Sequence, residues 1–435
     1  MNIYFISLGC DKNLADSEAM LGLLKDKNYT IVLEENKADV IVVNTCCFIN
    51  DAKDESIETI IEMAELKKTG NLKKLIVTGC LAQRYQEDII KEIPEVDALL
   101  GTTAIDDILD AIENDKTSFK DINYLPIIDS KRIVATGTFT SYIKISEGCD
   151  KFCTYCIIPS LRGRHRSVPM DKLIKEAEYL ANNGTKELIV VAQDTTIYGT
   201  DLYGKKKLPE LLKEFCKIEG IEWIRLLYCY PEDITDELIK TIKEEDKICK
   251  YIDMPIQHAS DNVLKRMGRR TNKQDLITVI NKLREEIPDI VIRTTLITGF
   301  PGESEEDFEE LVDFVYNMNF ERLGVFTYSA EEGTPAATMD NQIDENIKED
   351  RRDAIMELQQ DIVFDMNTEL IGRIFDVIIE GYIAEDDIYV GRTYMDAPNI
   401  DGLIFVECPK MLMTGDIVLA EVIRADGYDL IAKSL

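Results

Sequence analysis

Three cysteines, at positions 149, 153 and 156, constrain this chain more than any other feature of its sequence. They are spaced C-x3-C-x2-C and follow an apolar segment, residues 142–146, that is typical of a β-strand. Three thiolates at this spacing suit a 4Fe–4S cluster that has three protein ligands and one open iron. A zinc site would need a fourth Cys or His close by, and none follows until His165. We therefore expect an iron–sulfur cluster at the end of a strand.

The cysteine motif opens a series of alternating strand and helix segments in residues 135–366. Strands are expected at 142–146, 187–192, 223–228, 251–254, 291–297 and 323–328. Helical segments lie between them, such as 170–183, which ends at Gly184, and 304–317, which opens with Ser304 and three acids. Six such units predict an open, partial (β/α)6 barrel, whose active site would lie at the carboxyl ends of the strands.

Polar or reactive residues follow almost every strand of this series. They are Cys149, Gln193, Asp194, Tyr230, Gln257, His258, Gly299 and Ser329. A lone histidine is more often a core or loop residue than a ligand, so His258 is assigned no catalytic role. Two basic runs, within residues 162–166 and 265–270, either hold a carboxylate or phosphate or lie on solvated surface.

Residues 1–130 show a second alternation of strands and helices. Strands are expected at 3–7, 30–33, 40–44, 75–78 and 98–100, and helices at 16–27, 51–68, 81–91 and 105–114. Continuous apolar strands flanked by helices are typical of a parallel sheet that is covered on both faces. This region is therefore predicted to be a parallel α/β domain.

Three cysteines of this first domain, Cys10, Cys46 and Cys80, each follow a predicted strand. Ligands of open α/β sheets bind beyond the carboxyl ends of the strands, so the three thiols are expected to converge there as metal ligands. Buried structural cysteines are the alternative. Cys47 could replace Cys46 as a ligand, but Cys46 comes first at the strand end. The other cysteines, at positions 47, 216, 229, 249 and 408, are expected to be buried.

The pattern changes after a charged helical stretch at residues 344–364. Short alternating strands, including 374–380, 388–392, 404–406 and 417–423, are separated by turns and predict a small antiparallel β-barrel at residues 368–435. From residue 369 to 435 there are 13 acids and 5 bases. That charge is the wrong sign for a barrel that binds single-stranded nucleic acid.

Composition limits the cellular context and the partners. The 435 residues carry 50 Lys and Arg against 82 Asp and Glu, a formal net charge of −32. This balance opposes indiscriminate nucleic-acid binding, and it either attracts basic partners or only maintains solubility. No apolar stretch is long enough to span a membrane, and the N-terminus lacks the basic and apolar regions of a signal peptide. The chain is therefore expected to be a cytoplasmic α/β protein with no membrane partner.

The C-x3-C-x2-C motif, with an aromatic residue before its third cysteine and at the start of a βα series, resembles the radical S-adenosylmethionine (SAM) superfamily. The resemblance implies that the open iron of the Cys149, Cys153 and Cys156 cluster binds SAM, which the reduced cluster cleaves to a 5′-deoxyadenosyl radical. The glycine-rich turn at residues 297–303, I-T-G-F-P-G-E, resembles the SAM-contacting turn of that superfamily. Gly299 and Glu303 are therefore expected to bind the cofactor.

The whole chain resembles the methylthiotransferase family, in which a three-cysteine domain, a radical SAM core and a TRAM barrel occur in this order. Residues 7–18, S-L-G-C-D-K-N-L-A-D-S-E, resemble the signature of its ribosomal-protein branch, although family members often have Pro at position 11. So do residues 192–196, 257–260 and 391–398. The resemblance implies methylthiolation of the β-carbon of an aspartate in the twelfth small-subunit ribosomal protein. It also implies two 4Fe–4S clusters, the second held by Cys10, Cys46 and Cys80, and two molecules of SAM.

Two other functions stay open from the sequence. One is methylthiolation of a tRNA adenosine beside the anticodon, and the other is a non-catalytic Fe–S carrier. The acidic C-terminal barrel favours a basic ribosomal protein as the partner, docked near residues 385–387, Asp396 and Asp401. An electron donor such as flavodoxin or ferredoxin is the second expected partner. Beyond the six cysteines, the sequence identifies no catalytic residue.

Overall fold

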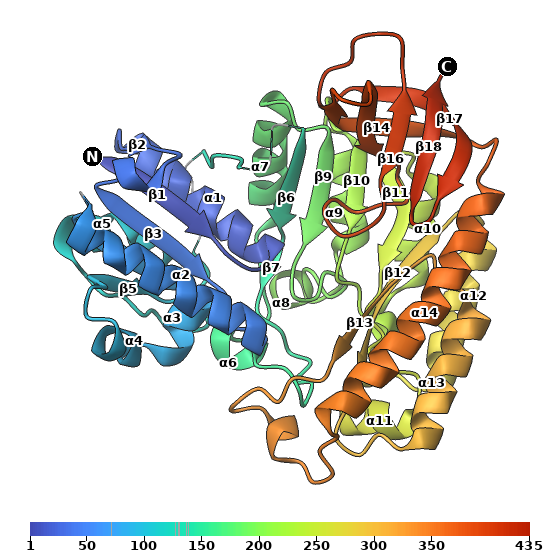
Figure 1. Ribbon diagram of the computed structural model, residues 1–435, viewed down its shortest axis with the longest axis horizontal. Helices are drawn as coiled ribbons and strands as arrows, with labels where there is room; N and C mark the ends of the chain where they lie inside the picture. The colour runs from blue at the N-terminus through green and yellow to red at the C-terminus, as the bar shows by residue number, and fades with distance from the viewer. Residues whose placement is uncertain (71, 127, 129–130, 136, 138) are drawn as a thin grey trace.

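A computed structural model of the protein describes every residue except 71, 127, 129–130, 136 and 138 (Figure 1). It confirms the predicted fold class, with a parallel five-stranded sheet, a parallel six-stranded sheet and a closed C-terminal barrel in chain order. The boundary predicted at residue 130 lies outside the described residues.

The N-terminal sheet consists of parallel strands in the order β2 (Thr30–Ile31), β1 (Asn2–Ser7), β3 (Val40–Thr45), β4 (Lys74–Gly79) and β5 (Ala98–Leu100). The central strands β3 and β4 are apolar along most of their length and almost entirely buried, as expected for a sheet with helices on both faces. The strands β1, β3 and β4 are neighbours, so their carboxyl ends lie side by side.

The helices of this domain are α1 (Asp11–Asp26), α2 (Asn50–Thr69), α3 (Cys80–Tyr85), α4 (Glu87–Glu92) and α5 (Ile108–Asn114), with 3-10 turns η1 (Glu35–Lys37) and η2 (Ile105–Asp107). The helix predicted at 16–27 begins earlier, directly after Cys10. Its first turns bury polar residues, including Lys12, Asn13 and Asp16, so they lack the apolar periodicity that marks a helix. The segment predicted as one helix at 81–91 is broken at Gln86, whose φ is 43°.

The central sheet has six parallel strands and stays open, as predicted. Its order is β13 (Arg322–Thr327), β12 (Val291–Thr298), β11 (Ile248–Asp253), β10 (Trp223–Leu226), β9 (Glu187–Val191) and β6 (Thr140–Lys144). A two-stranded ribbon, β7 (Ser146–Glu147) and β8 (Arg166–Ser167), follows β6 and frames the cysteine loop.

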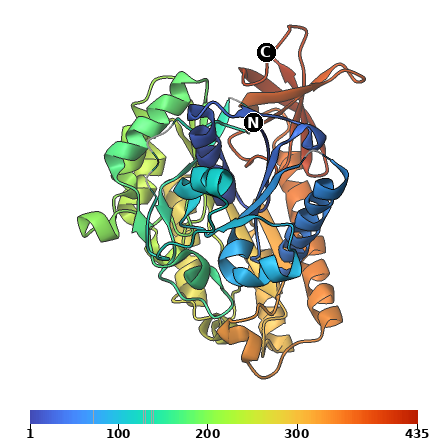
Figure 2. The same cartoon turned by 90° about the vertical axis from the view of Figure 1, so that its left-hand side faces the viewer.

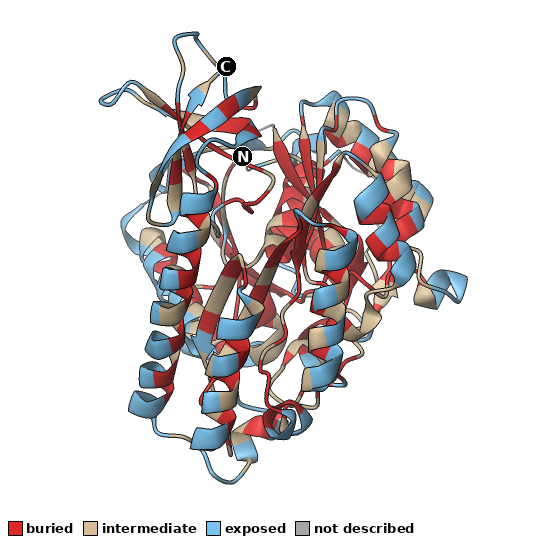
Figure 3. Ribbon diagram, turned by 90° about the vertical axis from the view of Figure 1, so that its right-hand side faces the viewer, coloured by how far each residue is buried: buried red, intermediate tan, exposed pale blue. Residues whose placement is uncertain are grey.

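Helices cover the outer face of this sheet, and their exposed residues face outward (Figure 3). They are α7 (Met170–Asn182), α9 (Leu208–Cys216), α10 (Asp236–Glu244), α12 (Lys273–Glu286) and α13 (Glu305–Met318), with short segments α6 (Ile158–Arg162), α8 (Thr200–Tyr203), α11 (Asp261–Arg266), η3 (Pro231–Asp233) and η4 (Pro335–Thr338). Ser304 caps α13 as expected: its hydroxyl accepts from the Asp307 N–H, and the Asp307 carboxylate accepts from the Ser304 N–H.

The long helix α14 (Glu345–Glu369) packs along α13, β12 and β13 and leads into the small C-terminal barrel, called the TRAM barrel below after the resemblance noted in the sequence. The barrel closes in the order β14 (Ile374–Ile383), β15 (Ile388–Arg392), β16 (Ile404–Glu407), β18 (Asp429–Ser434) and β17 (Ile417–Asp426). Four of its strand pairs are antiparallel, as predicted, whereas β16 and β18 run parallel.

The TRAM barrel packs against the inner face of the central sheet. Glu187 of β9, fully buried, pairs with Arg225 of β10 at 2.8 Å and with Arg392 of β15 at 2.6 Å. Asp396 is also buried, and its carboxylate accepts from Arg322. Asp401 accepts from the Tyr251 hydroxyl. These contacts correct one expectation: Asp396 and Asp401 hold the two barrels together and are not free to dock a partner.

The N-terminal domain lies in front of the central domain in Figure 2, and its contacts reach residues at or after the carboxyl ends of β6, β10 and β13. Arg84 of α3 pairs with Glu331, in the loop after β13, at 3.0 Å. At the opposite side of the contact, the Tyr228 hydroxyl, after β10, donates to Asp11 at 3.4 Å. Within the part of the chain that the structure describes, no helix is both long and apolar enough to cross a membrane.

Candidate metal centres and active site

The first thiol group, here called the barrel set, consists of Cys149, Cys153 and Cys156 in the loop between β7 and α6. The Cys149 N–H donates to the Gly163 carbonyl at 3.1 Å, and the Cys156 N–H donates to the Cys153 carbonyl at 3.0 Å. Thr154 fixes the loop, because its N–H donates to the Met267 carbonyl and its carbonyl accepts from the Ala336 N–H. The loop is thus held at the carboxyl end of β6, where the sequence predicted it.

The thiols of the barrel set are shielded from water. Burial raises the pKa of Cys149 to about 11 and that of Cys156 to about 12, so positive charge is needed to hold them as thiolates near neutral pH. A bound metal provides that charge and deprotonates coordinating thiols. Among the described residues, no three His, Cys, Asp or Glu side chains close on the position of a single ion. Thiolates that bind separate irons of a cluster need no such convergence.

The inner carboxyl end of the central sheet holds buried polar atoms without hydrogen-bond partners. They include Gln193 Oε1, Asp194 Oδ2, two guanidinium nitrogens of Arg269 and the Tyr328 hydroxyl. Burial raises the pKa of Asp194 to about 6, although Lys151, 3.5 Å away, opposes that rise. Unpaired buried donors and acceptors are costly, so this interior suits a polar ligand that carries charges of both signs. The amino, carboxylate and adenine groups of SAM have that chemistry.

The glycine-rich turn after β12 faces α14. Gly299 has a φ of 71°, and a Cβ placed on it would lie 2.1 Å from Lys348 Cγ. The buried Glu303 carboxylate pairs with Arg351 of α14 at 2.8 Å and accepts from the Phe300 N–H at 3.0 Å. Gly299 and Glu303 therefore help to pack the turn against α14. Their contact with SAM stays a prediction.

His258 lies in the same interior, fully buried. Its Nδ1 accepts from the Ser260 N–H at 3.0 Å, and Nε2 lies 3.7 Å from Glu303. Burial lowers the pKa of His258 to about 3, so the imidazole is neutral at physiological pH. This is a core histidine, the interpretation preferred from the sequence.

The second thiol group, here called the N-terminal set, consists of Cys10, Cys46 and Cys80. Cys46 directly follows β3, Cys80 directly follows β4, and Cys10 precedes α1 after β1. A Cβ placed on Gly9, whose φ is 86°, would lie 2.9 Å from Cys46 Sγ. The loop that carries Cys10 is therefore packed directly on the Cys46 thiol. The structure brings this predicted set to one edge of the sheet.

Cys46 and Cys47 differ in their surroundings, and which of them is a ligand stays a prediction. The Cys46 backbone is fixed on both sides by Ser56, whose hydroxyl bonds to the Cys46 N–H and carbonyl, and its thiol meets the Cys10 loop. Cys47 is fully buried in the apolar cluster that α2 covers. Of the remaining cysteines, Cys229 and Cys249 are also buried, whereas positions 216 and 408 are partly exposed.

Arg162, from the first basic run, lies between the two thiol sets. It ends α6, six residues after Cys156, and its guanidinium is buried. It pairs with Asp16 of α1 at 3.1 Å and with Glu147 at 2.9 Å. Burial raises the pKa of Cys80 to about 12, and the charge of Arg162 opposes that rise. The basic run is therefore neither a solvated surface nor a free anion site at this residue.

Lys144 extends this network. Its ammonium pairs with Asp16 and, at 2.7 Å, with Glu147. Although burial raises the pKa of Glu147, Arg162 and Lys144 together hold it well below its usual range. Two cations and two carboxylates thus join the domains beside the thiols. Sequence reasoning missed this role of Asp16, which lies in the 7–18 motif but was read there only as a helix start.

Three family models match successive parts of the chain. They are Uncharacterized protein family UPF0004 at residues 2–101, the Radical SAM superfamily at 143–315 and the TRAM domain at 371–434. Over its whole length the chain is 61% identical to a protein of Lachnoclostridium phytofermentans named ribosomal protein uS12 methylthiotransferase RimO, all of which is covered. It is 52% identical to the protein of that name from Clostridioides difficile, with 100% of this chain and 99% of that protein covered.

The chain belongs to the uS12 methylthiotransferase RimO family. As a member of this family it is a radical SAM methylthiotransferase that modifies a residue of ribosomal protein uS12.

Solved structures share its fold at low sequence identity. TsrM, a radical SAM methyltransferase from Kitasatospora setae, aligns with a TM-score of 0.55 at 12% identity over 77% of this chain and 76% of that chain. OxsB, a cobalamin-dependent SAM radical enzyme, aligns with a TM-score of 0.53 at 14% identity over 83% of this chain and 56% of that chain. Both likenesses concern the fold alone.

Proposed function

We propose that this RimO-family enzyme methylthiolates the β-carbon of an aspartate of uS12, using SAM and two 4Fe–4S clusters. The observation that supports the proposal is that two domains each carry three cysteines beyond strand ends and are joined beside them by the Arg162–Asp16 ion pair. A carrier of iron–sulfur clusters would need neither the second set nor the polar interior of the barrel.

In this proposal the barrel set holds the cluster that binds SAM. The polar interior around Gln193, Asp194 and Arg269 would receive the charged groups of SAM. Together, SAM and that cluster supply the radical chemistry needed to break an unactivated C–H bond. The protein contributes a loop that carries the three cysteines, two of them buried, and backbone hydrogen bonds that fix this loop.

The N-terminal set would hold the second cluster, whose open iron would carry the added sulfur that is transferred. Arg162 would counter part of the negative charge of thiolates at this edge, since it already acts on the Cys80 thiol. Asn13 fixes the surrounding backbone: its amide donates to the Thr45 carbonyl at 2.9 Å, immediately before Cys46. These residues hold the sulfur-donating site in place relative to the barrel.

Mass spectrometry of ribosomal proteins and tRNA from a deletion strain tests the substrate. We expect uS12 from that strain to lack the methylthio group and tRNA to be unchanged. If the deletion strain lost a methylthiolated adenosine from tRNA while uS12 kept its methylthio group, the substrate would be tRNA and not uS12. An unchanged pattern in both would refute the proposal.

Cysteine replacements test the separate roles of the two sets. Changing the barrel set to Ala should abolish reductive SAM cleavage. Changing Cys10, Cys46 and Cys80 to Ala should leave cleavage measurable and stop methylthiolation. A product formed without the N-terminal set would contradict its role in sulfur transfer.

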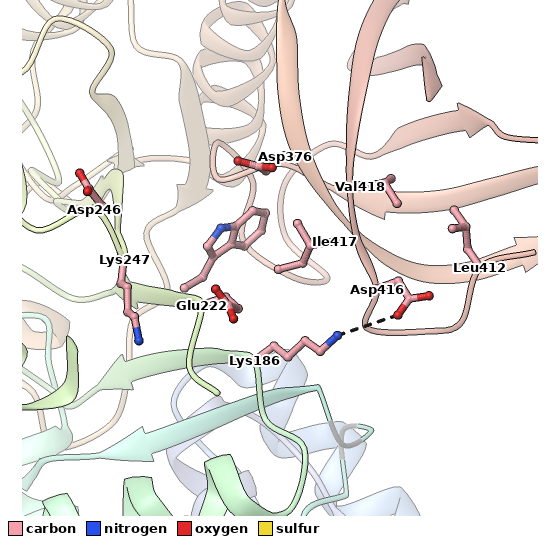
Figure 4. Close-up of a pocket in the computed structure, with 10 residues that line it drawn as sticks. Lys186, Glu222, Asp246, Lys247, Asp376, Leu412, Asp416, Ile417 and Val418 are labelled. Carbon is pink, nitrogen blue, oxygen red and sulfur yellow. Dashed lines mark ion pairs between the residues drawn. The ribbon is translucent and has the colours of Figure 1, made fainter. Parts of the chain in front are cut away.

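We further propose that acidic surface on and beside the TRAM barrel steers the basic substrate protein. A cavity of about 600 Å³ lies between the central sheet and the TRAM barrel (Figure 4). Four acids line it, Glu222, Asp246, Asp376 and Asp416, against two lysines. It lies beside the amino ends of β9 to β11, at the opposite end from the thiols. A basic segment of uS12 bound in this cavity would anchor the substrate protein, while a different segment of uS12 carries the target aspartate to the reaction site.

Residues 385–387 add three exposed acids in the turn between β14 and β15 of the same barrel. The electron donor, such as flavodoxin or ferredoxin, would approach the barrel set elsewhere. Phe152 and Arg164 mark a surface where it could approach: Phe152 lies in the cysteine loop with 48% of its surface exposed, and the Arg164 guanidinium is 4.5 Å from its ring centroid.

Because its substrate is a ribosomal protein, we place the enzyme in the cytoplasm.

A further inference from the structure

Lys12 is a buried cation without a carboxylate partner. It lies in the first turn of α1, two residues after Cys10, and only 7% of its surface is exposed. Within the described residues, no Asp or Glu oxygen is within ion-pair distance of its Nζ. Two comparable lysines differ: the half-buried Lys144 at the same domain contact pairs with Glu147 at 2.7 Å, and the buried Lys151 of the cysteine loop pairs with Glu232 at 3.0 Å.

The groups that face Lys12 are the Tyr228 ring, the Cys10 thiol and the Asp11 carboxylate, and none of them forms a salt bridge with its Nζ in the part of the chain that the structure describes. Its Nζ lies 3.3 Å from the centroid of the Tyr228 ring, a cation–π contact with a neutral group. Tyr228 is fixed at the carboxyl end of β10 by a hydrogen bond from its N–H to Asp253 at 2.9 Å. The nearby Asp11 carboxylate already accepts from the Tyr228 hydroxyl. A buried charge is costly without a counter-charge, so this position favours an incoming anion.

We propose that Lys12 binds the side-chain carboxylate of the target aspartate. The inference rests on the proposed function, in which the β-carbon of that aspartate reacts. The carboxylate is bonded directly to this carbon, so a cation that holds it also fixes the reacting atom. Lys12 lies where such a residue is needed, between Cys10 of the N-terminal set and the carboxyl edge of the central sheet.

This arrangement makes Lys12 a specificity-determining residue. An anionic thiolate set repels a carboxylate, and the Lys12 ammonium offsets that repulsion for aspartate alone. An asparagine of nearly the same shape gains nothing from the charge. The alternative role is structural, in which Lys12 only pins α1 to Tyr228. The two roles differ in one measurable property, the preference for aspartate over asparagine.

The test compares the affinity of the enzyme for uS12 with Asp and for uS12 with Asn at the modified position. We expect wild type to prefer the Asp form by about 10- to 100-fold, as for hydrogen bonds to charged groups. Lys12→Met keeps the apolar stem over Tyr228 and should reduce this ratio to near one. Lys12→Arg keeps the charge and should retain most of the preference. Lys25→Met, on the exposed face of the same helix, is the matched control.

The outcomes separate this inference from the proposed function. If wild type does not modify uS12, the proposed function fails whatever Lys12 does. If wild type modifies uS12 but Lys12→Met keeps the full preference, or wild type shows none, the role of Lys12 is refuted. Iron content and urea unfolding report whether Lys12→Met folds. Should it not fold, Lys12→Arg decides: a folded variant that loses the preference overturns the inference.

Discussion

The buried ion pairs between the TRAM barrel and the central sheet predict a large, local loss of stability in one variant. Arg392 and Glu187 are both fully buried and pair at 2.6 Å, and Arg225 completes the group. Burial alone would raise the pKa of Glu187, but the two guanidinium groups outweigh it and lower the value from 4.5 to about 2. That shift corresponds to about 3 kcal/mol of stabilisation at neutral pH. Removing one partner of a buried pair typically costs about 3–5 kcal/mol.

We therefore expect Arg392→Leu to weaken the attachment of the TRAM barrel by about 3 kcal/mol at pH 7. The matched control is Arg424→Leu, because the Arg424 side chain is 65% exposed and pairs only with Asp426, at 3.6 Å. Exposed pairs contribute about 0–1 kcal/mol, so the control should unfold almost as wild type does.

The single tryptophan of the chain provides the assay. Trp223 lies in the cavity that Ile417 and Val418 of the TRAM barrel also line, so its fluorescence reports separation of the two barrels (Figure 4). In urea, the transition of Arg392→Leu should shift to lower concentration. Equal midpoints for the two variants would refute the argument that the buried pair holds the barrels together.

Acid should weaken the same attachment in wild type. A carboxyl group with a lowered folded-state pKa stabilises the fold fully above its unfolded-state value, here 4.5. The contribution of Glu187 declines as the pH falls below that value and is lost near pH 2. Between pH 7 and pH 5 the difference between wild type and Arg392→Leu should therefore stay constant.

Three further predictions concern the metal centres and the partner. Anaerobically reconstituted protein should hold about eight irons per chain, and a zinc-only preparation without broad visible absorbance would contradict the two clusters. Gly9→Ala should lower iron toward about four per chain, because the new Cβ meets Cys46, whereas Gly204→Ala, with a similar φ and open space, should not. Changing Glu385 and Asp386 to Lys should slow uS12 association several-fold at low salt and little at high salt. Two charge reversals at exposed positions of α14 serve as the control. Equal association rates for the two variants would mean that the acids at 385–386 only face solvent and do not steer the substrate.

The strands, and the position of cysteines at their ends, could be predicted because they depend on local sequence. In the first two domains, apolar runs indicate buried parallel strands without any knowledge of which strands and helices pack against them. A cysteine that directly follows such a strand lies at the edge of the sheet. The start of α1 could not be predicted in this way. Its first turns face another domain with Lys12, Asn13 and Asp16, and polar residues buried by distant partners carry no periodic signal.

Residues whose role depends on a distant partner were the least predictable. Asp396 was assigned to a docking surface from its place near a turn, yet Arg322, 74 positions earlier, holds it in the interior. Glu303 pairs with Arg351 through its carboxylate, a contact that the sequence did not indicate, and its binding of SAM stays a prediction. Both are acids in sequence motifs, and sequence alone cannot distinguish an acid kept for a ligand from one paired across an interface.

The same long-range pairing explains how one enzyme can use two metal centres on one carbon atom. Sulfur transfer requires the reacting carbon to lie within reach of the radical and of the sulfur donor, and an error of about 1 Å can cost about 100-fold in rate. Short α6 connects Cys156 to Arg162, and Arg162 reaches Asp16 on the helix that begins after Cys10. The two thiol sets are therefore linked through one helical turn and one buried ion pair. Such a link fixes the position of one thiol set relative to the other, as a reaction at a single carbon atom requires.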